Sequence, residues 1–467
     1  MKIKFFGATE TVTGSKHMIT SHSGKKYLLD CGLYQGIGSQ TDSLNRHFGF
    51  NPSELEAVFL SHAHIDHSGN LPLLVKEGFN GHIYCTPGTL EVCEILLLDS
   101  AAIHEHDCIF INKRRNKMGL EPIKPLYTTK DAEHCLKHFK TIPYRTDFQI
   151  SEEIKIHFTD AGHILGSAAI HVTEKLSDKI TRLTYTGDIG RFTDLLMKAP
   201  EAFPASDYII SESTYGDRLH ENNLDSELRL LNIIRKTCLE KKGKLIIPAF
   251  SLGRTQEIIF MLDKFKTNGL LPKIEVYVDS PLSTSATNIM RNNLDSFNDN
   301  VQEYLKSDGD PFGFEGLHYI RKIEESMRLN EDNTPCIIIA ASGMMDAGRI
   351  KHHLRHQIGK SKNTVLIVGY CSPNTLGGQL LSGKKEVKIF GEFFKVNAEV
   401  EIINSYSAHA DYAEMIRYLS CQKKEEVKTI FLVHGETNSK LSFMKRLNDQ
   451  GYEKVILPQN GEEFTLE

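Results

Sequence analysis

The sequence predicts an α/β protein in which one domain interrupts another. Its 467 residues are too many for a single ordinary core, so two or three domains are expected. Between residues 209 and 395, helices alternate with near-continuous apolar strands, a pattern typical of parallel strands buried on both faces. In 1–208 and 396–467, short strands end in loops that carry histidine or aspartate. We therefore expect an outer domain, 1–208 and 396–467, interrupted by an inserted parallel-sheet α/β domain, 209–395.

The individual elements are predicted from apolar runs bounded by turn residues. A helix is expected after residue 70, because Leu71, Leu74 and Val75 recur at helical spacing and Pro72 is tolerated in a first turn. A longer helix is expected over 89–117. Strands are expected at residues 3–6, 17–21, 26–30, 57–61, 82–85, 154–159, 168–173, 182–186, 399–404 and 429–433 of the outer domain, and at 208–211, 245–248, 275–278, 336–340 and 364–368 of the inserted one.

Composition and charge exclude several classes of protein. Hydrophobic residues make up 40% of the chain, and no apolar run approaches the roughly 18 residues of a membrane span. The nine cysteines include no C-x-x-C pair and the short apolar start does not resemble a secretory signal, so we expect a cytoplasmic protein without a disulfide framework. A formal net charge of −5 excludes a strongly basic nucleic-acid-binding protein. A polyanion would have to be held by local basic patches or by metal.

Residues 61–69 carry the strongest chemical signal in the chain. The imidazoles and the carboxylate of His62, His64, Asp66 and His67 fall within six positions directly after an apolar run. Such groups are preferred zinc ligands when cysteine is absent. Neighbouring side chains point in different directions, so the spacing predicts two metals, one on His62 and His64 and the other on Asp66 and His67. A histidine-rich turn is the alternative, and the length of the string argues against it.

Four further residues repeat one placement, near glycine at the end of a predicted strand: Asp30, His163, Asp188 and His434. Singly, each fits a turn or capping residue as well as a site residue. Their recurrence at strand ends, where α/β proteins build their sites, favours a centre shared with 61–69. The carboxylate of Asp188 would be suited to bridge two cations.

The order of these groups along the chain resembles the metallo-β-lactamase superfamily. Later strings resemble its β-CASP branch of nucleic-acid-processing nucleases, and they stand at 211–216, 248–257, 279–282, 341–344, 407–411 and 434. A histidine at the last of them, His434, is typical of RNA-processing members, whereas DNA-processing members usually carry valine there. The resemblance spans nearly the whole chain.

The resemblance implies a fold, a ligand set and two Zn²⁺ per chain. The outer domain would be an αββα metallo-β-lactamase sandwich, and the inserted one a β-CASP domain. The implied ligands are His62, His64 and His163 for the first zinc, Asp66, His67 and His434 for the second, and Asp188 as a bridge. Asp30 would orient a ligand by hydrogen bonding, and Glu212 and His409 would form an acid pair near the leaving group. Mn²⁺ is an alternative metal, because mixed histidine and carboxylate sites accept both.

These groups fit the hydrolysis of a phosphodiester. A metal-bridging hydroxide would be the nucleophile, because two cations about 3.5–4 Å apart lower the pKa of bound water toward roughly 7 and also stabilise charge on the phosphate. His409, kept charged by Glu212, would protonate the leaving 3′ oxygen, leaving a 3′ hydroxyl and a 5′ phosphate. We therefore predict a two-zinc ribonuclease whose catalytic residues are Asp66, Glu212, His409 and Asp30.

Three further sets of residues need a separate interpretation: possible phosphate contacts, basic segments and a second histidine-rich string. Arg254 and Ser342 are expected to grip substrate phosphate, because the family places their loops toward the active site, and Ser407 is a third candidate. The basic segments 113–117 and 349–356 are either solvated helix faces or guides for phosphates. The string 104–107 mimics a metal site, but residues two apart on a helix face different sides, so a surface or packing role is expected.

Alternative functions stay open beside this prediction. A DNA-directed β-CASP nuclease is opposed by the histidine at position 434, and a non-catalytic scaffold of an RNA-processing complex would have lost metal ligands that are all present here. A small-molecule hydrolase such as a lactamase or thioesterase would have no use for Glu212 and His409. The expected partners are a single-stranded RNA and, as an option, a second copy in a homodimer. Internal cutting and 5′-to-3′ trimming are both open.

Overall fold

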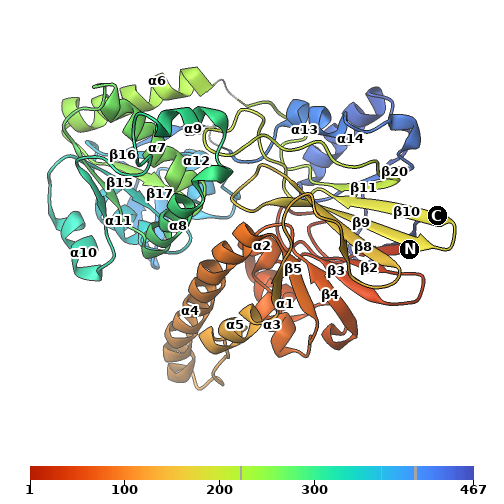
Figure 1. The fold of residues 1–467 in the computed structure, drawn as a ribbon. Helices are drawn as coiled ribbons and strands as arrows, with labels where there is room; N and C mark the ends of the chain where they lie inside the picture. Colours follow the sequence, from red (N-terminus) through yellow and green to blue (C-terminus); the bar gives the residue numbers. More distant parts are fainter. Residues whose placement is uncertain (221–222, 370, 404–406) are drawn as a thin grey trace. The chain divides into compact units, whose positions relative to one another are not determined.

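The computed structural model describes residues 1–220, 223–369, 371–403 and 407–467. The chain divides into two compact units, unit 1 with Met1–Leu219 and His409–Glu467 and unit 2 with His220–Ala408 (Figure 1). Among the helices that the structure describes, none is long and apolar enough to cross a membrane.

Unit 1 is built on two seven-stranded sheets, the first in the order β22-β1-β2-β3-β4-β5-β6. Its strands are β1 (Lys2–Phe5), β2 (His17–Thr20), β3 (Lys26–Leu29), β4 (Leu55–Phe59), β5 (His82–Cys85), β6 (Phe139–Thr141) and β22 (Glu463–Thr465). Pairing is antiparallel from β22 to β3 and parallel from β3 to β6. The last strand of the chain therefore extends the sheet beside the first.

The second sheet has the order β21-β20-β11-β10-β9-β8-β7. Its strands are β7 (Phe148–Gln149), β8 (Ile154–Asp160), β9 (Ala168–Leu176), β10 (Lys179–Tyr185), β11 (Tyr208–Ser211), β20 (Thr429–Leu432) and β21 (Val455–Ile456). Pairing is antiparallel from β7 to β10 and parallel from β10 to β21. Each sheet thus joins an antiparallel part to a parallel part.

The two sheets pack face to face through one apolar core. Phe5 and Phe59 enter it from the first sheet, and Phe158 and Phe431 from the second. Burying such a side chain contributes about 2–3 kcal/mol relative to leaving it exposed. Helices α3 to α5 lie on the outer face of the first sheet (Figure 1), and α13 and α14 pack on the second. This arrangement confirms the predicted αββα sandwich.

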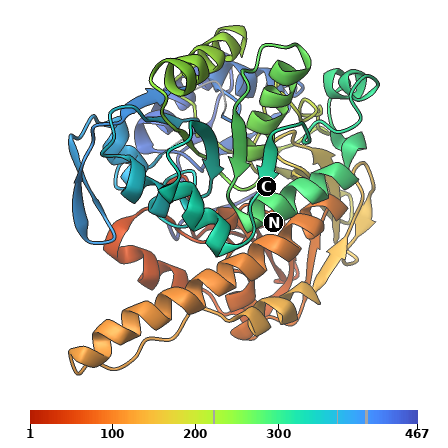
Figure 2. The ribbon, with the colours of Figure 1, turned by 90° about the vertical axis from the view of Figure 1, so that its left-hand side faces the viewer.

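The helices of unit 1 are α1 (Thr41–Arg46), α2 (Ile65–Ser68), α3 (Leu71–Lys76), α4 (Pro87–Lys117), α5 (Thr129–Leu136), α13 (Tyr412–Leu419) and α14 (Thr437–Asp449), with 3-10 turns at Gly38–Gln40, Pro52–Glu54 and Lys424–Glu426. Pro72 lies in the first turn of α3, as the sequence predicts. Helix α4 begins at a Thr86 cap that accepts the Thr89 N–H. Its C-terminal part runs past the strands of the first sheet (Figure 2) and is largely exposed.

Unit 2 contains a six-stranded parallel sheet in the order β14-β13-β15-β12-β16-β19. Its strands are β12 (Leu245–Pro248), β13 (Glu275–Val278), β14 (Leu317–Tyr319), β15 (Cys336–Ala340), β16 (Thr364–Ile367) and β19 (Glu399–Ile402), with a separate hairpin of β17 (Glu386–Ile389) and β18 (Glu392–Lys395). Its helical elements are α6 (Asn223–Ile234), a π-helix (Arg235–Glu240), α7 (Arg254–Thr267), α8 (Pro281–Asn292), a 3-10 turn (Leu294–Ser296), α9 (Asp299–Leu305), α10 (Ile323–Glu331), α11 (Ile350–Gln357) and α12 (Leu376–Leu381). The parallel sheet of this unit confirms the expected inserted fold.

Two strands near the predicted domain boundaries pair in ways that their apolar patterns do not indicate. β11 was grouped with the inserted domain, but it pairs with β10 and β20 in the second sheet of unit 1. Its lack of alternation reflects burial between the sandwich core and the α13–α14 layer. β19 was grouped with the outer domain, but it pairs with β16 in unit 2. Residue 404 of that expected strand lies outside the described residues, and the boundaries at 208/209 and 395/396 stay a prediction.

The loops that follow the parallel strands gather the candidate residues in unit 1. β3 leads into Asp30, β4 into 60–64, β10 into 186–190 and β20 into 433–436. In open α/β sheets, ligands bind beyond the carboxyl ends of the strands. The fold therefore directs these loops to one place.

A glycine controls how closely two of these loops approach. The Cys31 N–H donates to His67 O at 2.7 Å, which ties the end of β3 to helix α2. A Cβ atom at Gly32 would lie 1.5 Å from the carbonyl oxygen of Asp66, a backbone atom that cannot simply rotate away. Only glycine fits this contact.

We predict that Gly32→Ala lowers the free energy of unfolding by about 3 kcal/mol, because the overlap must push the 65–68 segment away from its place. Chemical denaturation monitored by circular dichroism measures the loss. Gly309→Ala is the matched control, because a Cβ atom there meets nothing within 4 Å, and its effect should stay within about 0.5 kcal/mol. Equal stability of the two variants would contradict this account.

Candidate metal centre

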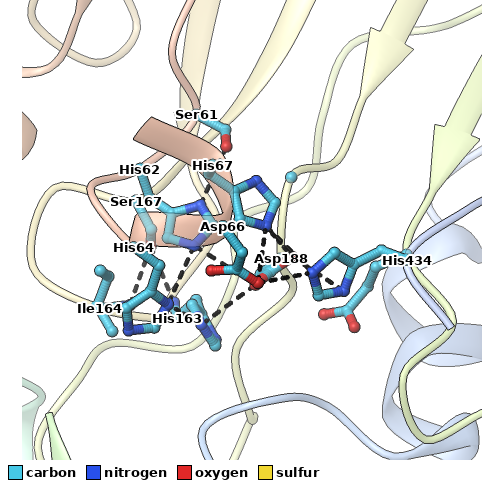
Figure 3. A network of polar contacts seen from close by, with 12 residues as sticks. Ser61, His62, His64, Asp66, His67, His163, Ile164, Ser167, Asp188 and His434 are labelled. Atoms are coloured by element: carbon cyan, nitrogen blue, oxygen red, sulfur yellow. Dashed lines mark hydrogen bonds and ion pairs between the residues drawn. The ribbon is translucent and has the colours of Figure 1, made fainter. Parts of the chain in front are cut away.

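Seven side chains from four distant segments meet in unit 1 (Figure 3). They are His62, His64, Asp66 and His67 after β4, His163 between β8 and β9, Asp188 after β10, and His434 after β20. They form two groups, and within each group the possible ligand atoms lie within 4.8 Å of one another. All seven positions come from the sequence prediction.

The first group contains three histidines and one carboxylate oxygen. Nε2 of His62 and Nδ1 of His64 are 3.1 Å apart, and Nε2 of His163 lies 3.3 Å from the same His64 nitrogen. Oδ2 of Asp188 lies 3.4 Å from His62 Nε2 and 3.6 Å from His163 Nε2. Three ring nitrogens and one oxygen thus face a common point.

The second group contains Asp66, His67 and His434. Nε2 of His67 lies 3.2 Å from Nε2 of His434, which in turn lies 3.3 Å from Oδ2 of Asp66. The other oxygen of Asp188, Oδ1, is 3.2 Å from His67 Nε2. The two oxygens of one carboxylate therefore face two different groups.

A buried carboxylate, that of Asp30, fixes the orientation of two of the histidines. Its Oδ2 accepts from the Ser61 hydroxyl and from His67 Nδ1, both at 2.7 Å, and from the Tyr185 hydroxyl at 2.8 Å. Because the Ser61 hydroxyl donates to Asp30, its oxygen can accept from His62 Nδ1 at 3.0 Å. Nδ1 of both imidazoles is thereby engaged as a donor, and Nε2, the nitrogen that a ligand histidine offers to a metal, faces the cluster.

A second chain of hydrogen bonds holds His434. The Thr214 hydroxyl donates to Glu212 Oε2 at 2.5 Å, and its oxygen lies 3.1 Å from His434 Nδ1. Glu212 is fully buried, and both of its oxygens lie 3.2 Å from His409 Nδ1. The predicted pair of Glu212 and His409 is therefore in contact, and Thr214 links it to the second group.

The charges of the centre favour bound cations. Burial lowers the pKa of His62, His64 and His163, to about 3 for His64, so these rings are neutral at pH 7. Burial also lowers the pKa of His67, but the carboxylates of Asp188 and Asp30 more than offset it and hold this pKa well above its usual value. The first group thus offers unprotonated ring nitrogens, and the carboxylates around His67 attract positive charge.

The residues present fit metal ions by two observations. In the first group, Nε2 of His62 and Nε2 of His163 both lie within 3.3 Å of Nδ1 of His64, which as a neutral ring atom carries at most one proton, whereas a cation at this place would be bound by all three nitrogens. Oδ1 of Asp188 is buried and has no partner in good hydrogen-bond geometry, although His67 Nε2 lies 3.2 Å away, and a buried carboxylate oxygen without such a partner is costly. Histidine nitrogens and carboxylate oxygens suit Zn²⁺ and Mn²⁺.

Two of the site residues have a strained backbone. Asp30 has φ 56° and His434 φ 50°, in the left-handed region that few non-glycine residues adopt, aspartate and histidine more often than most. Such residues cost of order 1 kcal/mol each and occur at functional sites. The strain is the cost of turning these side chains toward the cluster at the strand ends.

His409 lies next to the first group. It forms a β-bridge with Gly190, and its ring centroid is 4.5 Å from that of His163. Burial lowers the pKa of His409, but the carboxylates of Glu212 and Asp188 outweigh it and raise this pKa to about 9. Its side chain is 20% exposed, whereas that of Glu212 is 1% exposed. The imidazolium is therefore the member of the pair that solvent can reach.

The three expected phosphate contacts belong to unit 2, whereas the cluster belongs to unit 1. Arg254 is buried at the start of α7 and forms an ion pair with Glu257. The Ser342 N–H donates to Ala347 O at 3.1 Å, within the 342–348 loop, and Ser407 is buried. Their contact with substrate stays a prediction.

The histidine-rich string 104–107 is not part of the cluster. It lies within α4, where the Glu105 carboxylate accepts from Thr129 and the His104 ring packs on Tyr127 at 5.1 Å between centroids. These contacts, and the exposure of His106 and Asp107, agree with the expected surface or packing role. Cys31, next to Asp30, is buried, and burial raises the pKa of its thiol to about 12.

Three residues of the hydrogen-bond network were not identified as positioning residues from the sequence: Ser61, Tyr185 and Thr214. Ser61 and Thr214 each stand beside a motif residue, and a hydroxyl in that place is a weak signal for a partner of a ligand. Tyr185 ends a strand as an ordinary core aromatic would. Only the folded sheets bring its hydroxyl to Asp30.

A sandwich of this kind, with histidines and carboxylates gathered at its strand ends, defines a metallo-hydrolase, and comparison with protein families agrees. Residues 17–232 match the family "Metallo-beta-lactamase superfamily". Residues 255–380 match the "Beta-Casp domain", and residues 394–458 match the "Zn-dependent metallo-hydrolase RNA specificity domain".

Relatives similar along nearly the whole chain come from all three domains of life. Ribonuclease TTHA0252 of Thermus thermophilus is 32% identical over 99% of this chain and 99% of its own length. Transcription termination factor FttA of Methanocaldococcus jannaschii is 30% identical over 98% of this chain and 71% of its own. Cleavage and polyadenylation specificity factor 73 of Drosophila melanogaster is 31% identical over 97% of this chain and 62% of its own.

The chain belongs to the β-CASP branch of the metallo-β-lactamase superfamily. The resemblance drawn from the motifs is thereby confirmed. Membership makes the protein a metal-dependent hydrolase.

We predict that Asp30→Asn lowers metal affinity about 10- to 100-fold, because the groups around this carboxylate are donors and an amide N–H would face one of them. Competition for Zn²⁺ against a chelating dye measures the affinity. Tyr185→Phe is the control, since it removes one donor and keeps the carboxylate, and its effect should be much smaller. Unchanged affinity in Asp30→Asn would refute the role of this residue.

Proposed function

We propose that the protein is a ribonuclease that hydrolyses phosphodiester bonds of single-stranded RNA and leaves 5′-phosphate and 3′-hydroxyl ends. The observation that carries the proposal is the convergence of seven possible metal ligands into two groups that share Asp188. An RNA substrate is supported by the name of the Thermus relative, a ribonuclease that aligns over 99% of both chains. It is further supported by the RNA specificity domain matched at 394–458, which includes His434.

We propose that the two groups hold two zinc ions, with manganese as the alternative. His62, His64 and His163 would bind the first ion, Asp66, His67 and His434 the second, and each oxygen of Asp188 would bind one of them. When bound, such cations supply a water of lowered pKa and positive charge for the phosphoryl oxygens. Asp30 and Ser61 would keep the Nε2 lone pairs of His62 and His67 aimed at the ions.

In this proposal, His409 donates a proton to the leaving 3′ oxygen. Its Nδ1 is held by both oxygens of Glu212 at 3.2 Å, so Nε2 is the ring atom that would hand over the proton. Glu212 stabilises the charged ring and is itself fixed by the Ile189 N–H and the Thr214 hydroxyl. A general acid placed in this way contributes about 10²–10⁴ in rate.

The residues proposed to contact the substrate phosphates belong to unit 2. Arg254, Ser342 and Ser407 would contact phosphates of the RNA, and a serine hydroxyl or an arginine fork suits that task. Cytoplasmic location, a homodimer and the choice between internal cutting and 5′-to-3′ trimming stay predictions.

With Zn²⁺, the protein should cleave a labelled RNA faster than a DNA of the same sequence, and excess chelator should abolish the cleavage. Asp66→Ala should reduce the rate at least about 100-fold, because it removes one of the ligands of the second ion. Asp42→Ala serves as the control, since this exposed carboxylate pairs only with Arg46 among the ion pairs that the structure describes. Equal turnover of RNA and DNA would refute the substrate assignment, and undiminished cleavage by Asp66→Ala would refute the metal mechanism.

His409→Ala should lower the single-turnover rate by about 10²–10⁴ while metal content stays that of the wild type, because the proton donor is lost and the ligands are kept. Mass spectrometry of the products should find 5′-phosphate and 3′-hydroxyl ends. His82→Ala, an exposed histidine on β5, should change neither. A 2′,3′-cyclic phosphate product, or a full rate in His409→Ala, would contradict the proposed chemistry.

A further inference from the structure

The β17–β18 hairpin of unit 2 exposes two phenylalanine rings. Phe393 on β18 is 69% exposed and Phe390 in the turn is 48% exposed. Large aromatic side chains usually bury most of their surface, because leaving one exposed forfeits about 2–3 kcal/mol. Two of them three residues apart on one hairpin form a surface that folding alone does not explain.

The register of the hairpin keeps its two faces distinct. Val387 and Ile389 are buried in the core of unit 2, and Phe394, opposite Val387, packs against the same core. On the other face Lys388 lies directly opposite Phe393. The buried face is therefore complete without Phe393, whose ring is left on the outer face.

One lysine lies over each exposed ring. Lys388 Nζ lies 5.6 Å from the centroid of the Phe393 ring. Lys351 Nζ, on α11, lies 5.0 Å from that of Phe390, and the His352 ring lies 4.7 Å from it. Both lysines lie over the rings as cation–π contacts. Proteins bind unpaired nucleic-acid strands with aromatic rings and cations placed together, because bases stack on ring faces and phosphates pair with the cations.

The charge of this surface differs from that of the chain. Residues 384–395, the half-buried Lys351 and the exposed Arg355 carry six lysines and arginines against two glutamates, in a protein of net charge −5. Arg355 joins helix and hairpin through a 3.0 Å ion pair with Glu392. Arg349, which caps the start of α11, and His353 within it form ion pairs with the buried Asp279, so the surface role falls to the remaining basic residues.

We propose that the hairpin surface formed by Lys351, His352, Lys388, Phe390, Phe393 and Lys395 binds a single-stranded segment of RNA. This inference rests on the proposed function for its choice of polyanion. Stacking would give affinity with little sequence preference, because every base has a flat face. The lysines would add a salt-dependent contribution from contacts to phosphates.

The test is fluorescence anisotropy of a labelled 20-nucleotide uridine RNA, with chelator present so that no turnover occurs. Phe393→Ala should weaken binding about five- to tenfold, which is the lower end of the range expected when an aromatic stacking partner is lost. Phe393→Trp should restore binding, whereas Phe393→Leu, which keeps apolar area without a ring, should not. Lys388→Gln should reduce the slope of log affinity against log salt by about 0.7.

Met327→Ala is the matched control, because this side chain is 58% exposed on α10 of the same unit and lies beside acidic residues. Thermal unfolding of each variant checks that the fold is kept. Wild-type affinity in Phe393→Ala, full affinity in Phe393→Leu, or an equal loss in Met327→Ala would overturn the inference and leave an acidic protein as the partner to seek. The binding assay involves no cleavage, so failure of the proposed catalytic function would appear separately, as intact RNA when wild-type protein is supplied with Zn²⁺.

Discussion

The candidate metal centre of unit 1 depends on a cluster of buried imidazoles that surrounds one carboxylate, that of Asp188. His62 and His163 each bring Nε2 to within 3.3 Å of Nδ1 of His64, and burial keeps these rings neutral. A neutral His64 Nδ1 carries at most one proton to share between two neighbouring nitrogens, whereas a bound cation would be ligated by all three. Asp188, with one oxygen toward each group, is the residue around which both groups are organised.

Much of the surrounding fold serves to place these side chains. The parallel strands of the two sheets end where the site loops begin, and the glycine contact at position 32 brings the β3 end against α2. Asp30 then accepts hydrogen bonds from Ser61, His67 and Tyr185 in a fully buried position. The strained backbone at Asp30 and His434 and the burial of charged groups lower the stability of the fold. Metal binding would offset this cost, because an ion that binds only the folded protein stabilises it.

The sequence could predict the metal centre because its chemistry is concentrated in short strings. The spacing of His62, His64, Asp66 and His67 shows the residue types of a metal site directly, and a strand end near glycine identifies the more distant partners. The sandwich and the parallel sheet were predictable from the same strings and from apolar strands without alternation. Most strand positions were predicted within two or three residues, because strongly apolar runs mark their own limits.

Other features depend on tertiary contacts that a sequence pattern does not carry. β11 and β19 look alike as short apolar strands, and only their neighbours decide which sheet each joins. The short edge strands β6, β7, β21 and β22 lack the apolar runs that predict a strand. In the sequence, Tyr185 cannot be told from an ordinary aromatic residue of the core, because only the folded sheets bring its hydroxyl to Asp30. The exposed ring of Phe393 likewise depends on register, because a shift by one residue would bury it and expose Phe394.

The central claim is that this chain holds two metal ions at once, and native mass spectrometry of the freshly purified protein tests it most directly. We predict that each chain carries the added mass of two metal ions. Dialysis against chelator should remove this added mass, and added Zn²⁺ should restore it. A protein that takes up a single ion per chain, or none, at saturating Zn²⁺ would contradict the claim.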